Sequence, residues 1–318
     1  MSAPSLASIS VDLDSLPHYC RIQGLAESTL SEDALSAVAT RAIPRFLELF
    51  ARVGTTATFF VIGSDLALPG MKRALLDSHA AGVELANHSW SHDYALSRWP
   101  REDIDADLLR SEKAIAELGV EVKGFRAPGY TLTPRLLQAV ASRGYEYDSS
   151  AFPATPYYLA KASVMGALAL LQRPSRAILD SPTVLGAPRV PYRPSLTAPY
   201  RRGHAPLVEL PMAIAPVTRV PFIGTFVTSA PWPLVELTFR TLKSDAFINF
   251  ELHAIDVLDD TDGVPEALAR QQRDLHVPAR QKLERLEKVF RWLGEARQRV
   301  TVLEAARALR PLAEGATE

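Results

Sequence analysis

The chain has a single cysteine, Cys20, among its 318 residues. One thiol cannot form an internal disulfide, and it cannot supply the several thiolates that a cysteine-based zinc cluster requires. A metal site in this chain would therefore have to use histidine, aspartate or glutamate side chains.

The chain also lacks an excess of charge of either sign, and it lacks a long apolar run. Its 35 lysines and arginines against 36 aspartates and glutamates give a formal net charge of -1, whereas a nucleic-acid-binding domain is expected to be strongly basic. The longest apolar candidate, residues 162–171, is shorter than the roughly 18 residues of a membrane span. The N-terminal residues have neither the basic nor the apolar region of a secretory signal. We expect a cytoplasmic protein with no nucleic-acid partner.

What the chain does have is a regular alternation of strand and helix patterns. Strands are predicted at residues 7–13, 57–62, 83–86, 122–126, 145–147, 208–210, 247–252 and 300–302. Helices are predicted from Ser31, with a bend at Pro44, from Thr133, and at residues 69–81, 101–118, 232–242 and 279–296. This order predicts an α/β fold with a parallel sheet, in a single domain of residues 1–318. A barrel and an open doubly wound sheet both remain open, but both bind ligands at the carboxyl ends of their strands.

Polar side chains follow four of the predicted strands. They are Asp12 and Asp14, His88 and His92, Arg126, and His253 and Asp256. Two imidazoles with one carboxylate form an open three-ligand site that suits Zn²⁺, Fe²⁺, Mn²⁺ or Co²⁺. The second aspartate could take a proton from metal-activated water.

The remaining side chains of these clusters suit supporting roles. Arg126 could hold a carboxylate in its ionised form. His253 could be a general acid, with Asp256 or another carboxylate fixing its tautomer. Each side chain alone is equally typical of a turn cap, a surface ion pair or a structural histidine. Only the four clusters together favour catalysis.

The order of these motifs resembles that of the polysaccharide deacetylase family, also known as the NodB-homology group or carbohydrate esterase family 4. In chain order the motifs are Asp12-x-Asp14, Ala57-Thr-Phe-Phe-Val-Ile-Gly63, His88-Ser-x-x-His92, Arg126-Ala-Pro128 and Leu252-His253. The residue between the two aspartates resembles the intracellular branch of the family. The resemblance covers residues 7–148 and 245–305 and leaves the middle of the chain unmatched.

This resemblance implies a distorted (β/α) barrel and metal-dependent hydrolysis of an N-acyl amino sugar. It implies metal ligands at Asp14, His88 and His92, a general base at Asp12, an orienting residue at Arg126 and a general acid at His253. Zinc is the expected ion, and iron, manganese, cobalt or nickel would also suit these ligands.

The chain departs from the family pattern at two motifs. Gly129 stands where an aromatic residue usually follows the proline, and Tyr130 is displaced by one position, so both are candidates to support the oxyanion. The Asp-Trp motif of the family is absent, and Glu209 is a candidate to support Arg126 instead. The sequence also resembles the branch that includes deformylases of lipid-linked amino-arabinose and allantoinase-like amidases, so the acyl group is acetyl or formyl.

The unmatched residues 151–206 form a Pro-rich basic insertion with nine of the 24 prolines. They include one acid, Asp180, and seven basic residues: Lys161, Arg173, Arg176, Arg189, Arg193, Arg201 and Arg202. Residues 157–171 are apolar and are expected to be helical. One interpretation is a buried helix followed by a solvated loop. The other is an interfacial helix beside a phosphate-binding rim, through which residues 157–202 contact an anionic membrane peripherally, at the inner surface.

We therefore expect a metal-dependent hydrolase that removes an acetyl or formyl group from an amino sugar, lipid-linked or nucleotide-linked. One alternative is an allantoinase-like amidase that acts on a small soluble amide. A second is a non-haem iron oxygenase with the same two histidines and one carboxylate. A third is a binding module without metal or catalytic activity. The sequence does not indicate an oligomeric state.

Overall fold

Strand β1 (Leu6–Asp12) lies at the centre of a parallel sheet and is buried along its whole length. In the computed structural model, which describes residues 5–27, 30–170 and 178–315, one edge of β1 pairs with β9 (Phe247–His253). The other edge pairs with β10 (Gln298–Arg299) and then with β2 (Thr58–Val61). The apolar, β-branched and aromatic side chains of these strands suit a sheet that is covered on both faces.

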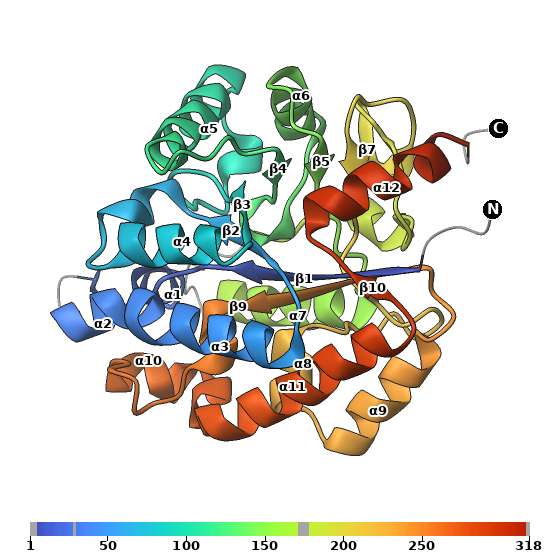
Figure 1. Ribbon diagram of the computed structural model, residues 1–318. Coiled ribbons are helices and arrows are strands. Elements are labelled where there is room, and N and C mark those ends of the chain that lie inside the picture. Colours follow the sequence, from blue (N-terminus) through green and yellow to red (C-terminus); the bar gives the residue numbers. More distant parts are fainter. Residues whose placement is uncertain (1–4, 28–29, 171–177, 316–318) are drawn as a thin grey trace.

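From β2 the sheet continues through four more parallel strands: β3 (Glu84–Asn87), β4 (Gly124–Phe125), β5 (Tyr147–Asp148) and β8 (Val208–Glu209). The chain beyond β8 then returns to β9. The N–H group of Ala213 donates to the carbonyl oxygen of Asn249 over 2.9 Å, and the Asn249 side chain donates to the carbonyl oxygen of Leu210 over 2.9 Å. The sheet is therefore curled into a distorted (β/α) barrel, as predicted, and is not an open sheet (Figure 1).

Helices cover this sheet above and below in the view of Figure 1. They are α1 (Leu16–Ile22), α2 (Glu32–Ala37), α3 (Ile43–Val53), α4 (Met71–Ala80), α5 (Arg101–Ala116), α6 (Pro134–Ser142), α7 (Thr155–Leu170), α8 (Gly224–Ser229), α9 (Trp232–Thr241), α10 (Glu266–Gln271), α11 (Ala279–Glu295) and α12 (Val302–Gly315). Ser31 and Thr133 cap α2 and α6 by accepting from the N–H groups of Ala34 and Leu136. These two caps begin the helices where the sequence predicts them.

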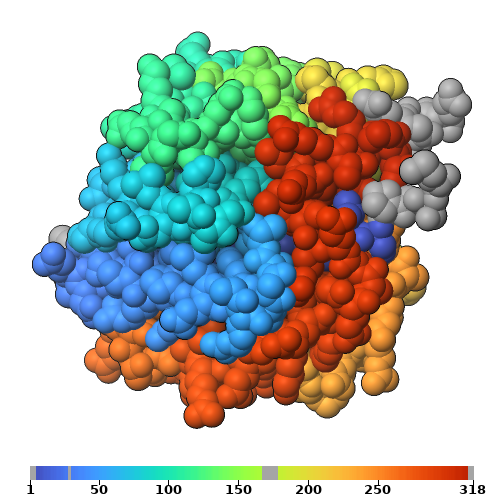
Figure 2. Space-filling model, in the orientation of Figure 1, coloured from blue at the N-terminus to red at the C-terminus, as the bar shows by residue number. Residues whose placement is uncertain are grey.

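Aromatic side chains join the helices to the barrel. The ring of Phe50 on α3 lies with its centroid 6.1 Å from that of Phe59 on β2 and 6.0 Å from that of Phe290 on α11. Figure 2 shows α11 and α12 (red) covering the start of the chain, of which only a small dark-blue area reaches this face. The first strand is thus held beneath the last helices.

The strand predicted at residues 300–302 is wrong by two positions. The strand is β10 at Gln298–Arg299, and α12 begins at Val302. The reason is a capping box: the N–H of Thr301 donates to Glu304 Oε2 over 2.8 Å, and the N–H of Glu304 donates to Thr301 Oγ1 over 3.2 Å. This reciprocal pair of hydrogen bonds begins a helix at residues that β-propensity alone assigns to a strand.

The insertion of residues 151–206 contains α7 and a short antiparallel hairpin of β6 (Pro194–Ser195) and β7 (Ala198–Arg202). Two of its basic side chains are used inside the fold. Arg189 forms an ion pair with Asp245, and Arg193 donates to backbone carbonyl groups of the hairpin region. The predicted basic residues Arg173 and Arg176 lie outside the described residues. No helix among the described residues is long and apolar enough to cross a membrane.

Gly124 on β4 lies where the barrel has no room for a larger side chain. A Cβ added at Gly124 would lie 1.8 Å from Cζ of Tyr147, whose hydroxyl donates to Glu84 over 2.7 Å. We expect Gly124→Ala to lower the free energy of unfolding by about 1–3 kcal/mol, because the ring cannot move without losing that hydrogen bond. Urea denaturation measures the change.

The matched control is Gly166→Ala on α7, where an added Cβ meets no atom within 4 Å. There, alanine should stabilise the helix by about 0.5–1 kcal/mol relative to glycine. Equal unfolding midpoints for the two variants would contradict the packing described around Gly124.

Candidate active site

The carboxyl ends of the barrel strands bring the predicted side chains to one cavity. Asp12 ends β1 and lies opposite His253, the last residue of β9. His88 follows β3, and Arg126 follows β4. The cavity measures about 290 Å³ and is lined by Asp12, Asp14, His88, His92, Tyr94, Gly129, Tyr130, Tyr157, Pro221, Ile223, Thr225, Phe226, Ser229 and His253. Parallel strands place side chains that are far apart in the sequence at the same edge of a sheet.

Asp14, His88 and His92 form the group that could hold a metal ion. Oδ1 of Asp14 lies 3.4 Å from Nε2 of His92 and 3.6 Å from Nε2 of His88, and all three side chains are buried. Among the described residues, this buried oxygen of Asp14 has no hydrogen-bond partner. A buried carboxylate oxygen without a partner is costly. The residues present therefore fit a divalent cation with two imidazole ligands and one carboxylate ligand.

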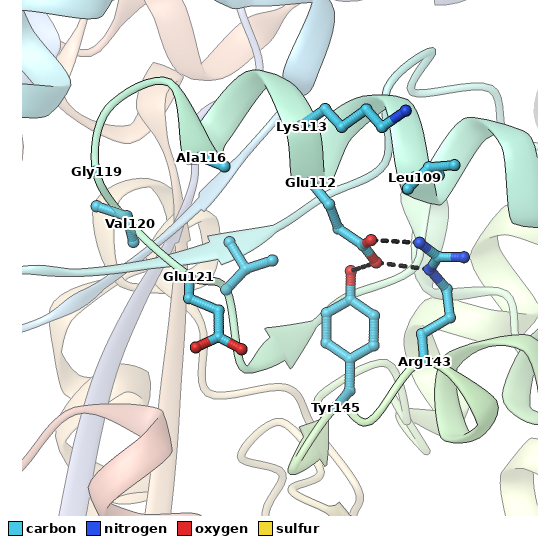
Figure 3. A pocket seen from close by; sticks show the side chains of 10 residues that line it. Leu109, Glu112, Lys113, Ala116, Gly119, Val120, Glu121, Arg143 and Tyr145 are labelled. Atoms are coloured by element: carbon cyan, nitrogen blue, oxygen red, sulfur yellow. Dashed lines mark hydrogen bonds and ion pairs between the residues drawn. The ribbon is translucent and has the colours of Figure 1, made fainter.

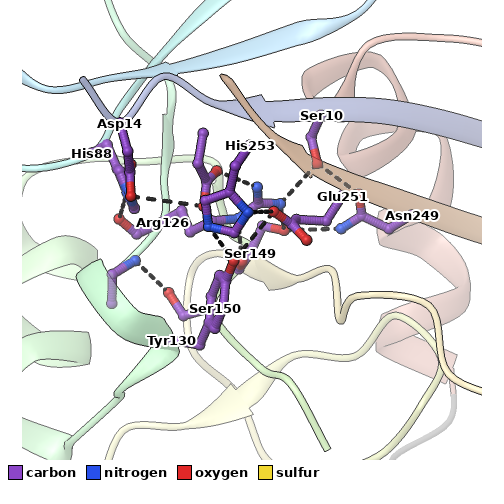
Figure 4. Close-up of polar contacts among 12 residues, drawn as sticks. Ser10, Asp14, His88, Arg126, Tyr130, Ser149, Ser150, Asn249, Glu251 and His253 are labelled. Atoms are coloured by element: carbon purple, nitrogen blue, oxygen red, sulfur yellow. Dashed lines mark hydrogen bonds and ion pairs between the residues drawn. The ribbon is translucent and has the colours of Figure 1, made fainter. Parts of the chain in front are cut away.

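The protonation of both histidines suits metal binding. Nδ1 of His88 lies 2.8 Å from the carbonyl oxygen of Arg126 (Figure 4). Because a carbonyl oxygen only accepts, Nδ1 of His88 carries a proton, and Nε2 is the nitrogen that faces Asp14. Burial, with smaller contributions from His18 and His88, lowers the pKa of His92 well below its ordinary value. The low pKa of His92 favours the neutral ring that a metal ion needs.

The loop that carries the two histidines has an unusual backbone. Ser89 and His92 both adopt left-handed conformations, with φ of 68° and 49°. Hydrogen bonds hold these conformations in place: the side chain of Asn87 accepts from the N–H of Ser89 over 2.8 Å, and Ser89 Oγ accepts from the N–H of His92 over 3.0 Å. Non-glycine residues in this region cost energy and are common at functional sites.

Asp107 on α5 supports the same loop from outside the cavity. Its two carboxylate oxygens accept from the N–H groups of Trp90 and Ser91, over 2.8 Å and 3.1 Å. These hydrogen bonds fix the turn between the two histidines without contact between Asp107 and either imidazole ring in the described structure.

A second network reaches this loop from a separate surface cavity of about 520 Å³. Figure 3 shows Glu112 of α5 in contact with Arg143 and with the hydroxyl of Tyr145. The Tyr145 hydroxyl in turn accepts from the side chain of Asn87 over 2.6 Å. The residue before His88 is thus held by a chain of hydrogen bonds that runs to the surface.

Asp12 and Arg126 form a buried ion pair in the floor of the site. Nη1 of Arg126 donates to Oδ1 of Asp12 over 2.5 Å, and the other oxygen of Asp12 lies 3.7 Å from Nε2 of His88. Burial alone would raise the pKa of Asp12, but Arg126, His88 and His253 outweigh it and lower the pKa. Asp12 is therefore held as a carboxylate that faces the metal-ligand group.

The hydrogen-bond acceptors of Arg126 include two serines that were not predicted. Its guanidinium donates to Ser10 Oγ over 2.9 Å and to the side chain and carbonyl oxygen of Ser149 over 2.9 and 2.8 Å. Glu209 instead accepts from the N–H of Ala151 over 2.9 Å, and electrostatic support of Arg126 by Glu209 stays a prediction. Glu209 lies on β8, two strands beyond β4, and there it is the register partner of a residue on β5.

His253 lies beside Asp12 on the neighbouring strand and is held by Glu251 on its own strand. Nδ1 of His253 forms an ion pair with Oε1 of Glu251 at 3.0 Å. Burial would lower the pKa of His253, but Glu251, Asp14 and Asp12 outweigh it and raise the pKa well above the ordinary value. Asp256, the predicted candidate, contacts His253 through the backbone N–H, over 2.9 Å. It shapes the turn, while Glu251 holds the ring.

Among the residues near the site that the sequence analysis missed are Glu251 and His18. Glu251 has a usable signal, because it stands two positions before His253 on a strand and so points to the same face. His18 has none: it comes from α1, and its ring lies 4.7 Å from that of His92 and 2.9 Å from a carboxylate oxygen of Asp65. Gly129 and Tyr130 both line the cavity as expected, but an oxyanion role for them stays a prediction.

Residues 30–147 match the family model described as polysaccharide deacetylase. This match confirms the resemblance that the motifs indicate, while the intracellular branch stays a prediction. The matched segment includes both histidines of the metal-ligand group and Arg126, whereas the aspartates of β1 and the histidine of β9 lie outside it. No match was found among the curated proteins.

Several solved structures are similar to the chain. One, assigned as a polysaccharide deacetylase from Mycobacterium smegmatis, has 17% sequence identity and a TM-score of 0.61, over 98% of this chain and 92% of that one. Another with the same assignment, from Pseudomonas aeruginosa PAO1, has 16% identity and a TM-score of 0.58, over 96% and 91%. The 4-alpha-glucanotransferase from Thermococcus litoralis has 13% identity and a TM-score of 0.56, over 95% of this chain and 40% of that one. At these identities the likeness establishes the barrel fold alone.

The ligand group and its supporting loop make a prediction about metal binding. His88→Ala removes an imidazole from the three-ligand group, so we expect the purified protein to lose stoichiometric zinc. Asp107→Asn keeps every ligand but weakens the acceptor of two loop N–H groups, and it should reduce zinc affinity by about 10- to 100-fold. Competition with a chromophoric chelator measures both affinities.

The control is Asp105→Asn on the same helix, which removes a partly exposed charge paired with Arg101. It should bind zinc as the unmodified chain does. Wild-type zinc affinity in His88→Ala would rule out the assigned ligand group.

Proposed function

We propose that this chain is a metal-dependent hydrolase that removes a small acyl group from the nitrogen of an amino sugar. The observation that carries the proposal is that three kinds of functional group meet at one cavity. They are a three-ligand group for a divalent cation, a carboxylate held ionised by Arg126, and a histidine that favours its protonated form. Amide hydrolysis needs all three: charge stabilisation, a base and an acid.

The family match of residues 30–147 supports this reaction class, because deacetylation of a carbohydrate is what a polysaccharide deacetylase carries out. Zinc is the ion we propose, since two imidazoles and one carboxylate with open positions suit it; iron, manganese, cobalt and nickel accept the same ligands. When bound to Asp14, His88 and His92, such a cation would polarise the acyl carbonyl group and lower the pKa of water.

Asp12 and His253 would then each carry out one of the two proton transfers. Asp12 takes a proton from the attacking water, and its ion pair with Arg126 keeps it ionised until that step. His253 lies on the neighbouring strand, opposite Asp12 in the register, and provides the proton that the leaving amine needs. The products are a short carboxylic acid and a free amino sugar.

The cavity suits a sugar better than an extended chain of apolar atoms. Its walls include the aromatic rings of Tyr94, Tyr157 and Phe226 above the polar floor. Aromatic faces pack against the C–H faces of sugar rings, and polar groups at the base fix the orientation. A volume of about 290 Å³ accommodates one acylated sugar unit.

Two of the alternatives lose support from this geometry. A non-haem iron oxygenase needs the two histidines and one carboxylate, but it has no use for Asp12 with its buried arginine or for His253 with Glu251. A binding module without activity has no use for a buried base. An allantoinase-like amidase would use the same groups on a smaller amide, and the choice of substrate decides between it and an amino-sugar hydrolase.

Replacement of the base tests the reaction. We expect Asp12→Asn to retain zinc and to lower kcat by about 1,000-fold, because the asparagine cannot accept the proton of water. The assay follows acetate and formate release from acylated amino sugars, free, nucleotide-linked and lipid-linked, with small soluble amides in parallel.

The matched control is Asp103→Asn, an exposed aspartate of α5. It should leave kcat unchanged. Equal activity of Asp12→Asn and the unmodified chain would contradict the mechanism, and cleavage of the small amides alone would replace the amino sugar with an allantoinase-like substrate.

A lipid-linked substrate is the finer part of the proposal, and α7 supports it. Leu159 and Val164 on this helix are 56% and 59% exposed, and Tyr157 on the same helix lines the cavity. Lys161 lies between them, with its Nζ 5.8 Å from the ring centroid of Tyr94. An exposed apolar helix face beside a cavity is typical of a surface that meets lipid.

The membrane prediction concerns these two exposed side chains. We expect the unmodified chain to sediment with vesicles that contain anionic lipid, and the double variant Leu159→Glu, Val164→Glu to stay in the supernatant, because the new charges oppose insertion. Val217→Glu is the control, since Val217 is 91% exposed but lies outside α7. Equal sedimentation of all three proteins would exclude a lipid contact through α7.

A further inference from the structure

The hydroxyl of Tyr130 contacts His253 in a way that the proton transfers above do not use. Its oxygen lies 3.0 Å from Nε2 of His253, and it donates to Oε1 of Glu251 over 3.2 Å (Figure 4). The other ring nitrogen, Nδ1, faces the same oxygen of Glu251 at 3.0 Å. Both nitrogens of His253 are thus engaged, and Nε2, the one that Glu251 leaves free, faces a hydroxyl group.

The backbone holds Tyr130 in this position at a cost. Gly129 and Tyr130 are both left-handed, with φ of 62° and 61°. A bulky residue in this conformation is strained, and such strain persists at functional sites. The N–H of Tyr130 donates to the carbonyl oxygen of Ala127 over 3.0 Å, and its ring packs edge-on against Phe152. The shift of the aromatic residue by one position, noted in the sequence, therefore delivers its hydroxyl to His253.

The charges around the Tyr130 hydroxyl favour the protonated forms of both Tyr130 and His253. Burial raises the pKa of Tyr130 well above 10, and Glu251 and Asp12 raise it further. Glu251, Asp14 and Asp12 also favour the protonated form of His253, as described above. A protonated imidazole beside a neutral hydroxyl can pass one proton in while another leaves, because the phenol oxygen accepts and donates at once.

We infer that Tyr130 is a catalytic residue that relays the proton of His253 to the leaving amine. As the C–N bond of the amide breaks, the Tyr130 hydroxyl turns from Glu251 to the leaving nitrogen, its O–H bond breaks and an N–H bond forms on that nitrogen. The proton on Nε2 of His253 moves to the phenol oxygen and restores the hydroxyl. His253 is left neutral and regains a proton from solvent water before the next turnover. The relay rests on the proposed N-deacylation.

The test compares two substrates that share an acetyl group but differ in the leaving group. An N-acetylated amino sugar releases an amine that must be protonated, whereas 4-nitrophenyl acetate releases a phenolate that leaves without a proton. In the zinc-loaded full chain, we expect Tyr130→Phe to lower kcat/KM for the amide about 100-fold and for the ester less than about threefold. Phenylalanine keeps the ring that packs against Phe152, and zinc content and unfolding midpoint are measured alongside.

The matched control is Tyr192→Phe, which also removes a fully buried hydroxyl, one that donates to the carbonyl oxygen of Pro199 over 2.8 Å. Tyr192 does not line the cavity, so both rates should stay at the wild-type level. If Tyr130→Phe loses both activities equally, Tyr130 only positions other groups and the relay is overturned. Unchanged or faster amide cleavage overturns it as well.

Failure of the proposed function gives a different result. In that case the unmodified chain hydrolyses the ester but none of the amides, which removes both N-deacylation and the relay, since no amine leaves. The two outcomes that overturn the relay alone leave amide cleavage by the unmodified chain intact.

Discussion

The buried ion pair between Asp12 and Arg126 is the interaction on which the rest of the site depends. Both side chains are almost completely excluded from water, and removal of two charges from water costs several kcal/mol per ion. The cost is offset only because the guanidinium has further acceptors on Ser10 and Ser149. The pair also ties β1 to β4 across the two strands that separate them, so it sets the distance between the base and the metal-ligand group.

The positions of the three proposed metal ligands likewise depend on residues that lie outside this group. Asp107 holds the turn between the two histidines from α5, and Asn87 holds its start from the hydrogen-bond chain through Tyr145. These groups allow Ser89 and His92 to keep left-handed backbone conformations. A loop with two histidines four residues apart would otherwise have many conformations, and few of them would point both imidazoles at Asp14.

The features that could be predicted from the sequence are those that depend on short segments of the chain. Alternating strands and helices, with side chains such as Asp12 and Arg126 at strand ends, are properties of short segments, and parallel pairing then brings them to one edge. The contacts that were missed are those between segments. Glu209 was chosen to support Arg126 and the acceptor Ser149 was missed, because the register of β5 and β8 cannot be inferred from spacing. The position of Tyr130 depends on a backbone conformation that spacing does not reveal.

The place of β1 in the sheet has a consequence for how the chain folds as it is synthesised. Strand β1 is made long before its neighbours β9 and β10, and Ser8 on β1 donates to the carbonyl oxygen of Thr301. Pairings between such distant segments form slowly, and until they form the apolar edges of the strand stay exposed. Asp12 therefore reaches its place beside His253 only after β9 has been made. A chain that stopped before β9 could not bring together the proposed base, acid and metal-ligand group.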